Sequence, residues 1–496
     1  MRARTRAPVV RRRERGGGRV VGSGTPRAAS FLLVVPGTAR SNDPPRHSRI
    51  NRAVLDEAAA GLAPTQPHSG AGVIFERARG RWAHRLSLGR RRRMRVLLAT
   101  WNMPGHLYPM VPLGWALRAS GHDVVVVSNP DLVPAIVGAG LPALGAGPEF
   151  DSYARLRDEL ERRSWKPAAP EPTSDPAAAA ERARRRRLNG FRLAAAAAQA
   201  QAPEAVAFAR RWQPDLIVFE PAGFVGPLIG TLLDVPTVRH LWSIDFTAPI
   251  AEFEEDLIGE LAAPYGLTRI GVNGDSTLDP APTRLQVADR QVRDPIRFVP
   301  YNGPAVLEPW LLEPPARPRV GITWGTSQSR LGFDHMVLAP RVVRALARHD
   351  VELAVAVTAD QRKLFEHVPD NVVHLGPAPL HQLASTCSVL VDQGGAGGVL
   401  TALVNGLPQL VISQMPDEVF HGHRVRDSGA GLNLPGTDLA DAEIAAAVDR
   451  LFESEFHTAA GELRDDMLAR PTPLAVVEQL ERLARAGAPQ RAEAPR

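Results

Sequence analysis

The sequence predicts an α/β protein with two doubly wound parallel-sheet domains joined by a linker. From residue 94 onward, short apolar runs rich in β-branched residues alternate with segments of helical periodicity, which is typical of parallel α/β folds. The alternation occurs in two series, separated by the proline-rich stretch 300–318. In each series, a conspicuous turn follows a predicted strand directly, at the position where open α/β sheets bind ligands.

The first series opens with a buried strand immediately after a run of four arginines. The predicted strands are Arg95–Ala99, Val124–Val127 and Asp215–Phe219, and the predicted helices are Val111–Ser120, Leu132–Gly138 and Gly226–Leu233. Between them, the segment Asp151–Arg187 is rich in proline and charge, which predicts a mobile loop region with helical pieces. We interpret its run Arg184–Arg187 as a solvated surface rather than a phosphate site.

The second series follows the proline-rich stretch. Its predicted strands are Arg319–Trp324, Val351–Val357, Val372–Leu375, Val389–Val391 and Gln409–Ile412, and its predicted helices are Met336–Arg348, Leu380–Ser385, Val399–Asn405, Val419–Ser428, Ala442–Phe452 and Leu474–Ala486. We therefore expect an N-terminal domain at 94–302, a linker at 303–318, a C-terminal domain at 319–486 and a tail at 487–496. Two such domains face each other across a ligand cleft at the carboxyl ends of their strands.

The charge is distributed unevenly along the chain. Residues 1–93 carry 21 arginines and five acids, a net charge of +16, whereas the rest of the chain carries −10. An acidic body repels a phosphate backbone, so we expect no nucleic-acid binding by the body. The basic stretch itself has no sustained periodicity and is expected to be a disordered extension, with Met94 as the natural start. A nucleic-acid-binding arm is the alternative for this stretch.

Cysteine content and hydropathy exclude several classes of protein. The single cysteine, Cys387, rules out an internal disulfide framework and a cysteine-based zinc site. No apolar run approaches the ~18–20 residues that a membrane span requires. We therefore expect a soluble, cytoplasmic protein without stable membrane insertion.

The sharpest motif is a glycine-rich turn between a predicted strand and the predicted helix Val399–Asn405. Glycines at such a turn let several backbone N–H groups approach one anion, and the helix N-terminus adds partial positive charge. The turn therefore predicts a diphosphate site, the alternative being a tight turn that needs only backbone freedom. No Gly-Lys-Ser/Thr follows, so it is not a P-loop. The motif reads Asp392, Gln393, Gly394, Gly395, Ala396, Gly397, Gly398.

The second motif is Pro104-Gly105-His106-Leu107-Tyr108-Pro109, after the first strand. A histidine at that turn can point its imidazole into the cleft, where a base that titrates near neutrality is useful. A lone loop histidine is more often structural, so this motif is weak by itself.

Together, the two motifs resemble those of GT-B-fold family 1 glycosyltransferases, whose two domains are Rossmann-like. The closer resemblance is to actinobacterial-type enzymes that attach deoxysugars to macrolide and other polyketide or aromatic aglycones. Six further stretches carry the resemblance across Met94–Ala486. They are Gly121–Val124, Trp212–Leu216, Val299–Pro304, Thr323–Ser327, Gly406–Leu410 and Gly429–Leu432.

The resemblance implies roles on the acceptor side. His106 falls on the catalytic base, which removes the proton from an acceptor hydroxyl as that oxygen attacks the anomeric carbon. Glu220 falls where the family often has an acid that holds this histidine, as in the His–carboxylate pair of hydrolases. Direct displacement of this kind inverts the anomeric configuration. The alternative for Glu220 is a strand-end carboxylate in solvent.

The resemblance also implies a donor side. The leaving diphosphate is expected on the backbone amides of the glycine-rich turn, near the hydroxyls of Thr326 and Ser327, with Ala378 at the nucleobase. Asp417 and Glu418 match the pair that accepts hydrogen bonds from the donor sugar, unless they only complement a helix dipole. No Asp-x-Asp occurs in the chain, so we expect no metal and no cofactor.

Three departures from the family pattern affect the donor side. Asp392 and Gln393 replace a His-His or His-Gln pair, and an ionised Asp392 facing a diphosphate is unfavourable unless it points away. Pro377 replaces an aromatic that stacks on the base in many relatives. Thr401 replaces a glutamate that binds both ribose hydroxyls, which favours a dTDP-sugar over a UDP-sugar.

The acceptor and the partners are less defined by the sequence. Trp101, Trp242 and Phe246 are candidates for stacking on an aglycone, with core packing as the alternative. The expected partners are a nucleotide-sugar donor and a small-molecule aglycone, and an activator protein or a homodimer remains open. Two other functions remain open: a catalytically weak helper subunit, suggested by Asp392, and a nucleotide-sugar 2-epimerase of the same fold.

Overall fold

The structure is a computed structural model, and it describes residues 93–162, 176–289 and 291–487. The predictions for the N-terminal extension and the C-terminal tail concern residues outside this described part, apart from one residue each. The described residues fall within one compact unit, 90–496. None of the helices in the described part of the chain has the length and apolar character that a membrane span requires.

The N-terminal domain is built on a seven-stranded sheet in the order β3-β2-β1-β4-β5-β6-β7, in which every pair of neighbours is parallel. The predicted strands are confirmed, and four further short strands extend the sheet. The strands are β1 (Arg95–Ala99), β2 (Asp123–Ser128), β3 (Ala143–Gly145), β4 (Leu216–Phe219), β5 (Thr237–His240), β6 (Ser276–Asp279) and β7 (Asp294–Pro295).

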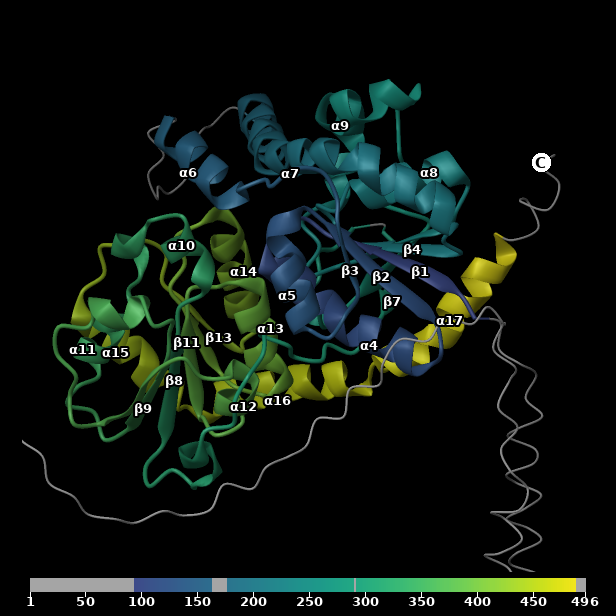
Figure 1. Ribbon diagram of the computed structural model, residues 1–496. Coiled ribbons are helices and arrows are strands. Elements are labelled where there is room, and N and C mark those ends of the chain that lie inside the picture. The colour runs from purple at the N-terminus through teal and green to yellow at the C-terminus, as the bar shows by residue number, and fades with distance from the viewer. Residues whose placement is uncertain (1–92, 163–175, 290, 488–496) are drawn as a thin grey trace, which may run out of the picture. The chain divides into compact units, whose positions relative to one another are not determined.

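Helices cover both faces of this sheet. The period of two along the strands decides which layer each side chain joins: Leu97 and Ala99 pack with α7, α8 and α9, whereas Val96 and Leu98 pack with α4, α5 and α17. Figure 1 shows α7, α8 and α9 along one side of this sheet. The helices are α3 (Pro104–Leu107), α4 (Val111–Ala119), α5 (Val133–Gly138), α6 (Ser152–Arg162), α7 (Pro176–Trp212), α8 (Val225–Leu233), α9 (Glu254–Ala262) and α17 (Pro473–Ala486).

The C-terminal domain contains a six-stranded parallel sheet in the order β10-β9-β8-β11-β12-β13. Its strand order reverses between β8 and β11, as the order of the first sheet reverses between β1 and β4. The strands are β8 (Arg319–Thr323), β9 (Glu352–Ala356), β10 (Val372–Gly376), β11 (Val389–Asp392), β12 (Gln409–Val411) and β13 (Gly431–Asn433). The helices are α10 (Thr326–Arg330), α11 (Ala339–Ala345), α12 (Leu380–Ala384), α13 (Ala396–Val404), α14 (Pro416–Asp427), α15 (Asp441–Arg450) and α16 (Ser454–Ala469).

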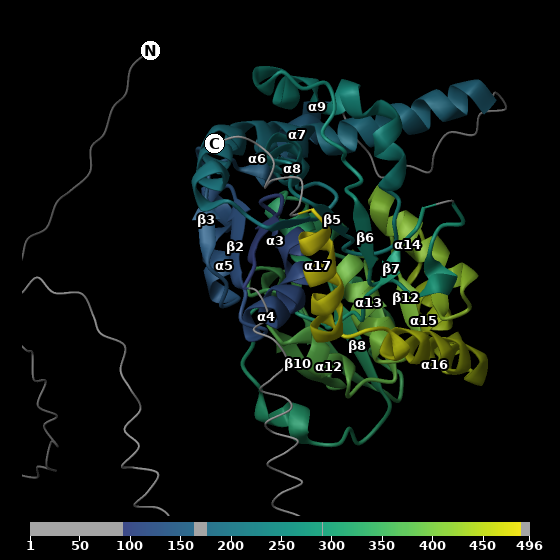
Figure 2. The ribbon, with the colours of Figure 1, turned by 90° about the vertical axis from the view of Figure 1, so that its right-hand side faces the viewer.

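The last helix belongs structurally to the first domain. The predicted C-terminal domain at 319–486 included α17, but Val476, Val477 and Leu480 of α17 lie in the core that α4 forms with the first sheet. In Figure 2 the yellow α17 lies at the front, and α16 leads into it. The apolar side of α17 would be unfavourable in water, and packing against the first sheet buries it. The second domain therefore ends before residue 473.

The helical content of the segment Asp151–Arg187 is greater than predicted. α6 begins at Ser152, and α7 extends for 37 residues, from Pro176 to Trp212, with Pro203 inside it. A long alanine-rich run favours helix, and the proline- and arginine-rich composition at its start obscured it.

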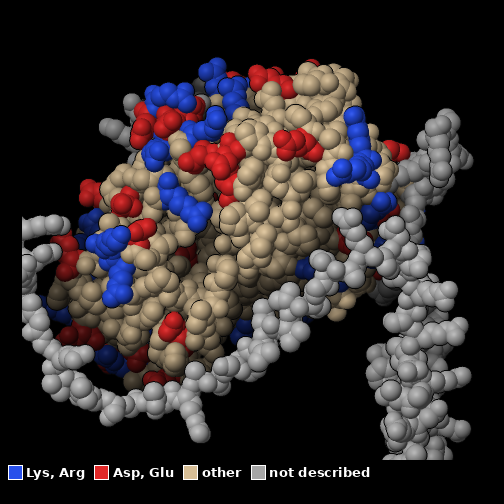
Figure 3. Space-filling model, in the orientation of Figure 1, with Lys and Arg blue, Asp and Glu red and all other residues tan. Residues whose placement is uncertain are grey.

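On the face shown in Figure 3, basic and acidic side chains of the described residues are interspersed. For example, Arg184 pairs with Asp256, on α9.

Candidate active site

The predicted base and acid meet at the carboxyl edge of the first sheet. β1 and β4 are neighbours in register, with Ala99 opposite Phe219, so the residues that follow the two strands lie together. Glu220 follows β4 directly, and α3 returns His106 over the end of β1. Nδ1 of His106 lies 2.9 Å from Oε2 of Glu220. The sequence-based pairing of these two residues therefore has the geometry of a hydrogen bond.

Glu220 is enclosed rather than exposed at the strand end. Its side chain is fully buried. Oε1 accepts a hydrogen bond from the Trp101 backbone N–H at 2.7 Å, and Oε2 accepts another from the Ala222 N–H at 2.8 Å. These amides hold the carboxylate so that it receives the Nδ1–H of His106, which leaves the lone pair on Nε2. The arrangement can orient a neutral imidazole as a general base.

Two indole rings border the imidazole. The ring of Trp101 lies edge-on to His106 with centroids 4.9 Å apart, and that of Trp242 is tilted at 4.5 Å. Both tryptophans also belong to the core of the first domain. The core-packing alternative is therefore correct for both indoles, and their contact with His106 leaves the acceptor role a prediction. The two indoles and Glu220 leave the His106 side chain 18% exposed.

A polar network behind Trp101 was not predicted from the sequence. Trp101 Nε1 donates to Ser152 Oγ at 3.0 Å, and this hydroxyl donates to Asn102 Oδ1 at 2.6 Å. Asn102 Nδ2 in turn donates to Asp131 Oδ2 at 2.6 Å. Ser152 starts α6, the helix whose Tyr153 ring lies under Arg330 of α10. The only sequence signal for this network was its position after β1 and at a helix start.

The glycine-rich turn joins the central strand β11 to the N-terminus of α13. Gly395 is the N-cap residue, so the first amides of α13 have no partner within the helix. Gly394 takes a φ of +95°, and a Cβ there would lie 2.8 Å from Val411 Cγ1 and 2.9 Å from the Glu418 carbonyl oxygen. The turn therefore requires glycine at 394. Its geometry is that of an anion site at the N-terminus of a nine-residue helix.

Asp392 lies beneath this turn rather than on its surface. Its side chain is 1% exposed, and Oδ1 accepts a hydrogen bond from the Gly394 N–H at 2.6 Å. That amide is therefore engaged within the protein. Burial raises the pKa of Asp392 to about 7, although the bond from Gly394 opposes the shift. The repulsion expected between Asp392 and a diphosphate is reduced by both this position and this pKa.

The predicted pair at the start of α14 is divided. Asp417 is exposed, whereas Glu418 is buried and accepts hydrogen bonds from the Met415 and Gln414 backbone amides at 2.8 and 3.1 Å. Burial, together with Asp417, raises the pKa of Glu418 to about 8. Gln328 of α10 donates to the same carboxyl group at 3.1 Å. Glu418 thus fastens α14 to α10, and of the pair only Asp417 is open to a ligand.

Two buried side chains near the turn, His421 and Gln361, were missed by the sequence reasoning, whereas Gln393 was predicted as part of the diphosphate-site motif. His421 Nδ1 donates to the Gly394 carbonyl at 2.8 Å, and burial lowers the pKa of this histidine. The Gly325 backbone is held from both sides: its N–H donates to Gln393 Oε1 at 3.0 Å, and its carbonyl accepts from Gln361 Nε2 at 2.9 Å. His421 lies within α14 and Gln361 follows β9 by five residues, so no sequence motif indicated either residue.

The remaining predicted donor-site residues are Thr326, Ser327 and Ala378. Thr326 and Ser327 are exposed on the first turn of α10, directly after Gly325. Ala378 is half-buried against the cluster that contains Trp310. The predicted acceptor residue Phe246 contacts the ring of Phe420 on α14, with centroids 5.6 Å apart, and that of Trp242 at 6.0 Å. A continuous series of rings therefore connects the base to the helix that follows β12.

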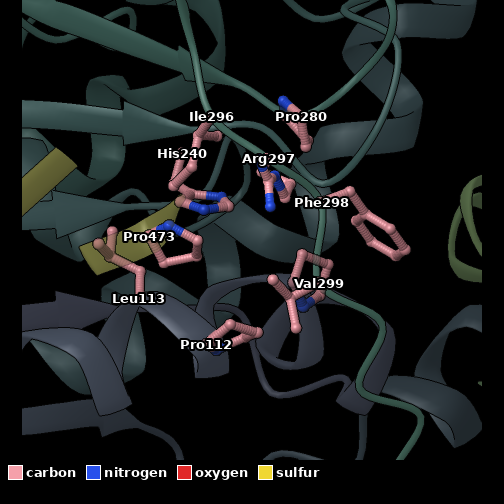
Figure 4. Close-up of a pocket in the computed structure, with 10 residues that line it drawn as sticks. Pro112, Leu113, His240, Pro280, Ile296, Arg297, Phe298, Val299 and Pro473 are labelled. Atoms are coloured by element: carbon pink, nitrogen blue, oxygen red, sulfur yellow. The ribbon is translucent and has the colours of Figure 1, made fainter. Parts of the chain in front are cut away.

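A small pocket lies between the start of α4, the end of β5 and the start of α17. Figure 4 shows His240 at the end of β5, with Arg297 and Phe298 of the connecting segment and Pro473 at the start of α17. His240 Nδ1 donates to the Leu241 carbonyl at 2.9 Å, and burial lowers the pKa of His240 to about 4. This histidine is therefore neutral and serves the packing between β5 and α17.

Solved structures of glycosyltransferases share this architecture. The glycosyltransferase VinC, solved in complex with dTDP, matches with a TM-score of 0.66 and 29% identity over 79% of this chain and all of VinC. The spinosyn rhamnosyltransferase SpnG complexed with thymidine diphosphate matches with a TM-score of 0.66 and 30% identity over 78% of this chain and all of SpnG. The fold and the paired turns define this protein as a GT-B-fold glycosyltransferase.

Family models and curated relatives identify its family. The erythromycin biosynthesis protein CIII-like N-terminal domain matches residues 115–325, and the corresponding C-terminal domain matches 340–483. The L-demethylnoviosyl transferase of Streptomyces niveus is 36% identical over 78% of this chain and 97% of its own length. The 10-deoxymethynolide desosaminyltransferase of Streptomyces venezuelae is 33% identical over 79% and 97%. The chain belongs to the erythromycin biosynthesis protein CIII-like family of antibiotic glycosyltransferases.

Proposed function

We propose that this enzyme transfers a deoxysugar from a dTDP-sugar to a hydroxyl group of a small polyketide-type aglycone, with inversion and without a metal ion. The observation that carries the proposal is the 2.9 Å contact between His106 Nδ1 and the buried carboxylate of Glu220. A base held in this way at a strand end is suited to remove the proton of an acceptor hydroxyl group. The polyketide class of acceptor is supported by relatives such as the desosaminyltransferase named above.

The proposed reaction is a single displacement. Nε2 of His106 takes the proton of the acceptor hydroxyl, the acceptor oxygen forms a bond to the anomeric carbon, and the bond from that carbon to the diphosphate oxygen breaks. The leaving dTDP gains one negative charge, which the first amides of α13 and its helix dipole stabilise. Attack opposite the leaving group inverts the anomeric centre.

The dTDP donor is supported by Thr401 and by the solved relatives. Thr401 is buried, and its hydroxyl donates to the Gly397 carbonyl at 2.6 Å, so it offers no carboxylate to a ribose 2′-hydroxyl. VinC and SpnG were both solved with thymidine diphosphate. A deoxyribose nucleotide needs no partner at that position.

The test is a transfer assay with the full chain, dTDP-sugars and a panel of polyketide aglycones in EDTA. We expect a glycoside product of inverted configuration and one equivalent of dTDP, with UDP-glucose as a poorer donor. Epimerised donor in the absence of acceptor would favour the 2-epimerase instead. Binding of dTDP with no turnover on any aglycone would favour the helper subunit. A requirement for a divalent metal would contradict the proposed electrostatics of α13.

A further inference from the structure

Asp392 is a buried carboxyl group with one good partner. It ends β11, and its Oδ1 receives the Gly394 N–H, whereas Oδ2 has no hydrogen-bond partner among the described residues. A Cβ added to Gly398 would lie 3.9 Å from its Cγ, so the carboxyl group lies directly behind the first turn of α13. Asp392 therefore supports the glycine-rich turn 392–398, which we call the donor turn, from its buried side.

Among the residues that the structure describes, none around Asp392 supplies a compensating positive charge. From α14 it is faced by Glu418 and the nearby Asp417, and by His421, whose pKa burial lowers. β12 and α13 carry no titratable side chain, and Arg319, the charged residue of β8, pairs with Glu352 at 2.8 Å. An ionised Asp392 would thus be a buried charge beside a second carboxyl group, stabilised only by Gly394 and the helix dipole.

A bound diphosphate changes this balance. It brings negative charge to the same helix N-terminus, where it competes for the positive potential that stabilises an ionised Asp392. The protonated carboxyl group keeps its Oδ1 as an acceptor for Gly394 and loses the repulsion. We propose that Asp392 is a positioning residue of the donor turn and that it takes up one proton when a nucleoside-diphosphate sugar binds.

The proposal rests on the donor site of the proposed function and predicts a pH dependence with a definite sign. Burial places the pKa of Asp392 near 7 in the free protein, and the bound diphosphate raises it further. Affinity is then fully present below pH 7 and falls as the pH rises above 7, by about tenfold per pH unit, until the bound-state pKa is reached. Asp392 thus tunes donor affinity without touching the donor.

The experiment is titration calorimetry of the full chain with dTDP-glucose, whose diphosphate diester does not titrate in this range. We expect binding to be about 30-fold weaker at pH 8.5 than at pH 6, and uptake of more than about half a proton at pH 7.5, from two buffers of different ionisation enthalpy. Asp392→Asn, which keeps an oxygen acceptor for Gly394, should bind with no proton uptake and an affinity that varies by less than about threefold.

Glu418→Gln is the matched control, because Glu418 is the other buried acid and should not be the proton's destination. Uptake that persists in Asp392→Asn, or disappears only in Glu418→Gln, overturns the assignment. Binding by the wild type without proton uptake overturns the proposal and leaves the donor site intact. No binding at any pH overturns both. If Asp392→Asn does not fold, an infrared difference spectrum of the wild type must show a new protonated carboxyl band on binding, and its absence overturns the proposal.

Discussion

Glu220 and Asp392 occupy equivalent positions in the two domains, yet their surroundings differ. Glu220 follows β4 and Asp392 ends β11, and at each of these strands the strand order of the sheet reverses. Each side chain is at most 1% exposed. Glu220 receives hydrogen bonds from Trp101, Ala222 and His106, whereas Asp392 receives one, from Gly394. Three donors hold the carboxyl group of Glu220 in place, while burial with a single donor raises the pKa of Asp392 to about 7. The predictions below test this contrast.

The largest effect is expected at the base itself. Replacing His106 by alanine removes the imidazole that faces Glu220 and should lower the transfer rate by about 10³–10⁴-fold. Calorimetry with dTDP should give an unchanged affinity, because the donor turn lies on the other domain. A variant that retains activity within tenfold would assign the base elsewhere.

A smaller loss is expected when the carboxyl group of Glu220 is replaced by an amide. In Glu220→Gln, one amide edge can only donate, so either Trp101 or the pair Ala222 and His106 loses its acceptor. We expect kcat to fall by about 10²–10³-fold with little change in the KM for the donor. Asp215→Asn, at the other end of β4, serves as a control for general effects on this strand. Equal losses in both variants would mean that Glu220 acts only through stability.

A substitution at Gly394 should disrupt the backbone conformation of the donor turn. Gly394→Ala places a methyl group 2.8 Å from Val411 at a φ of +95°, which should lower the free energy of unfolding by about 2–5 kcal/mol and weaken dTDP binding at least tenfold. Gly397→Ala is the matched control, since nothing lies within 4 Å of its added Cβ, and its stability should be unchanged or slightly raised. Urea unfolding and calorimetry measure both effects.

The smallest effect is expected at the contact between Phe246 and Phe420, which joins the first domain to α14 of the second. Phe420→Ala removes the ring that contacts Phe246, which in turn borders Trp242 beside the base. Aromatic pairs contribute about 0.5–1.5 kcal/mol, so we expect a two- to tenfold lower transfer rate with the dTDP affinity retained. Phe420→Leu should restore most of the rate by filling the volume. If alanine instead weakens donor binding alone, the ring acts within the second domain only.

Strand-end chemistry was the part of this molecule that sequence predicted best. The central strands β1, β4, β8 and β11 are largely apolar runs, whereas the pairing of His106 with Glu220 was implied by the family resemblance and agrees with the adjacency of β1 and β4. The glycine-rich turn was equally visible, because a positive φ and a close approach leave few alternatives to glycine at 394. The central strands and the glycine-rich turn depend on local sequence, which is why they could be predicted.

Features that depend on distant packing could not be predicted. Glu418 was predicted to contact the donor sugar, but its carboxyl group is buried, because it accepts hydrogen bonds from the amides of Gln414 and Met415 and from Gln328, 90 residues away. The orientation of Asp392 is likewise decided by the burial of β11. The network through Ser152 and Asn102 links residues 50 apart with no motif. Such contacts are properties of the assembled domains.

The return of α17 to the first sheet makes the second domain an insertion. The chain leaves the first domain after β7 and comes back before Pro473, and the two crossings touch: the Arg297 N–H donates to the Pro471 carbonyl at 2.7 Å. Anyone exchanging sugar specificity between related enzymes must therefore cut the gene twice at this crossing. A chimera joined at a single point would pair one enzyme's first sheet with another's final helix, and that mismatched core would limit its yield.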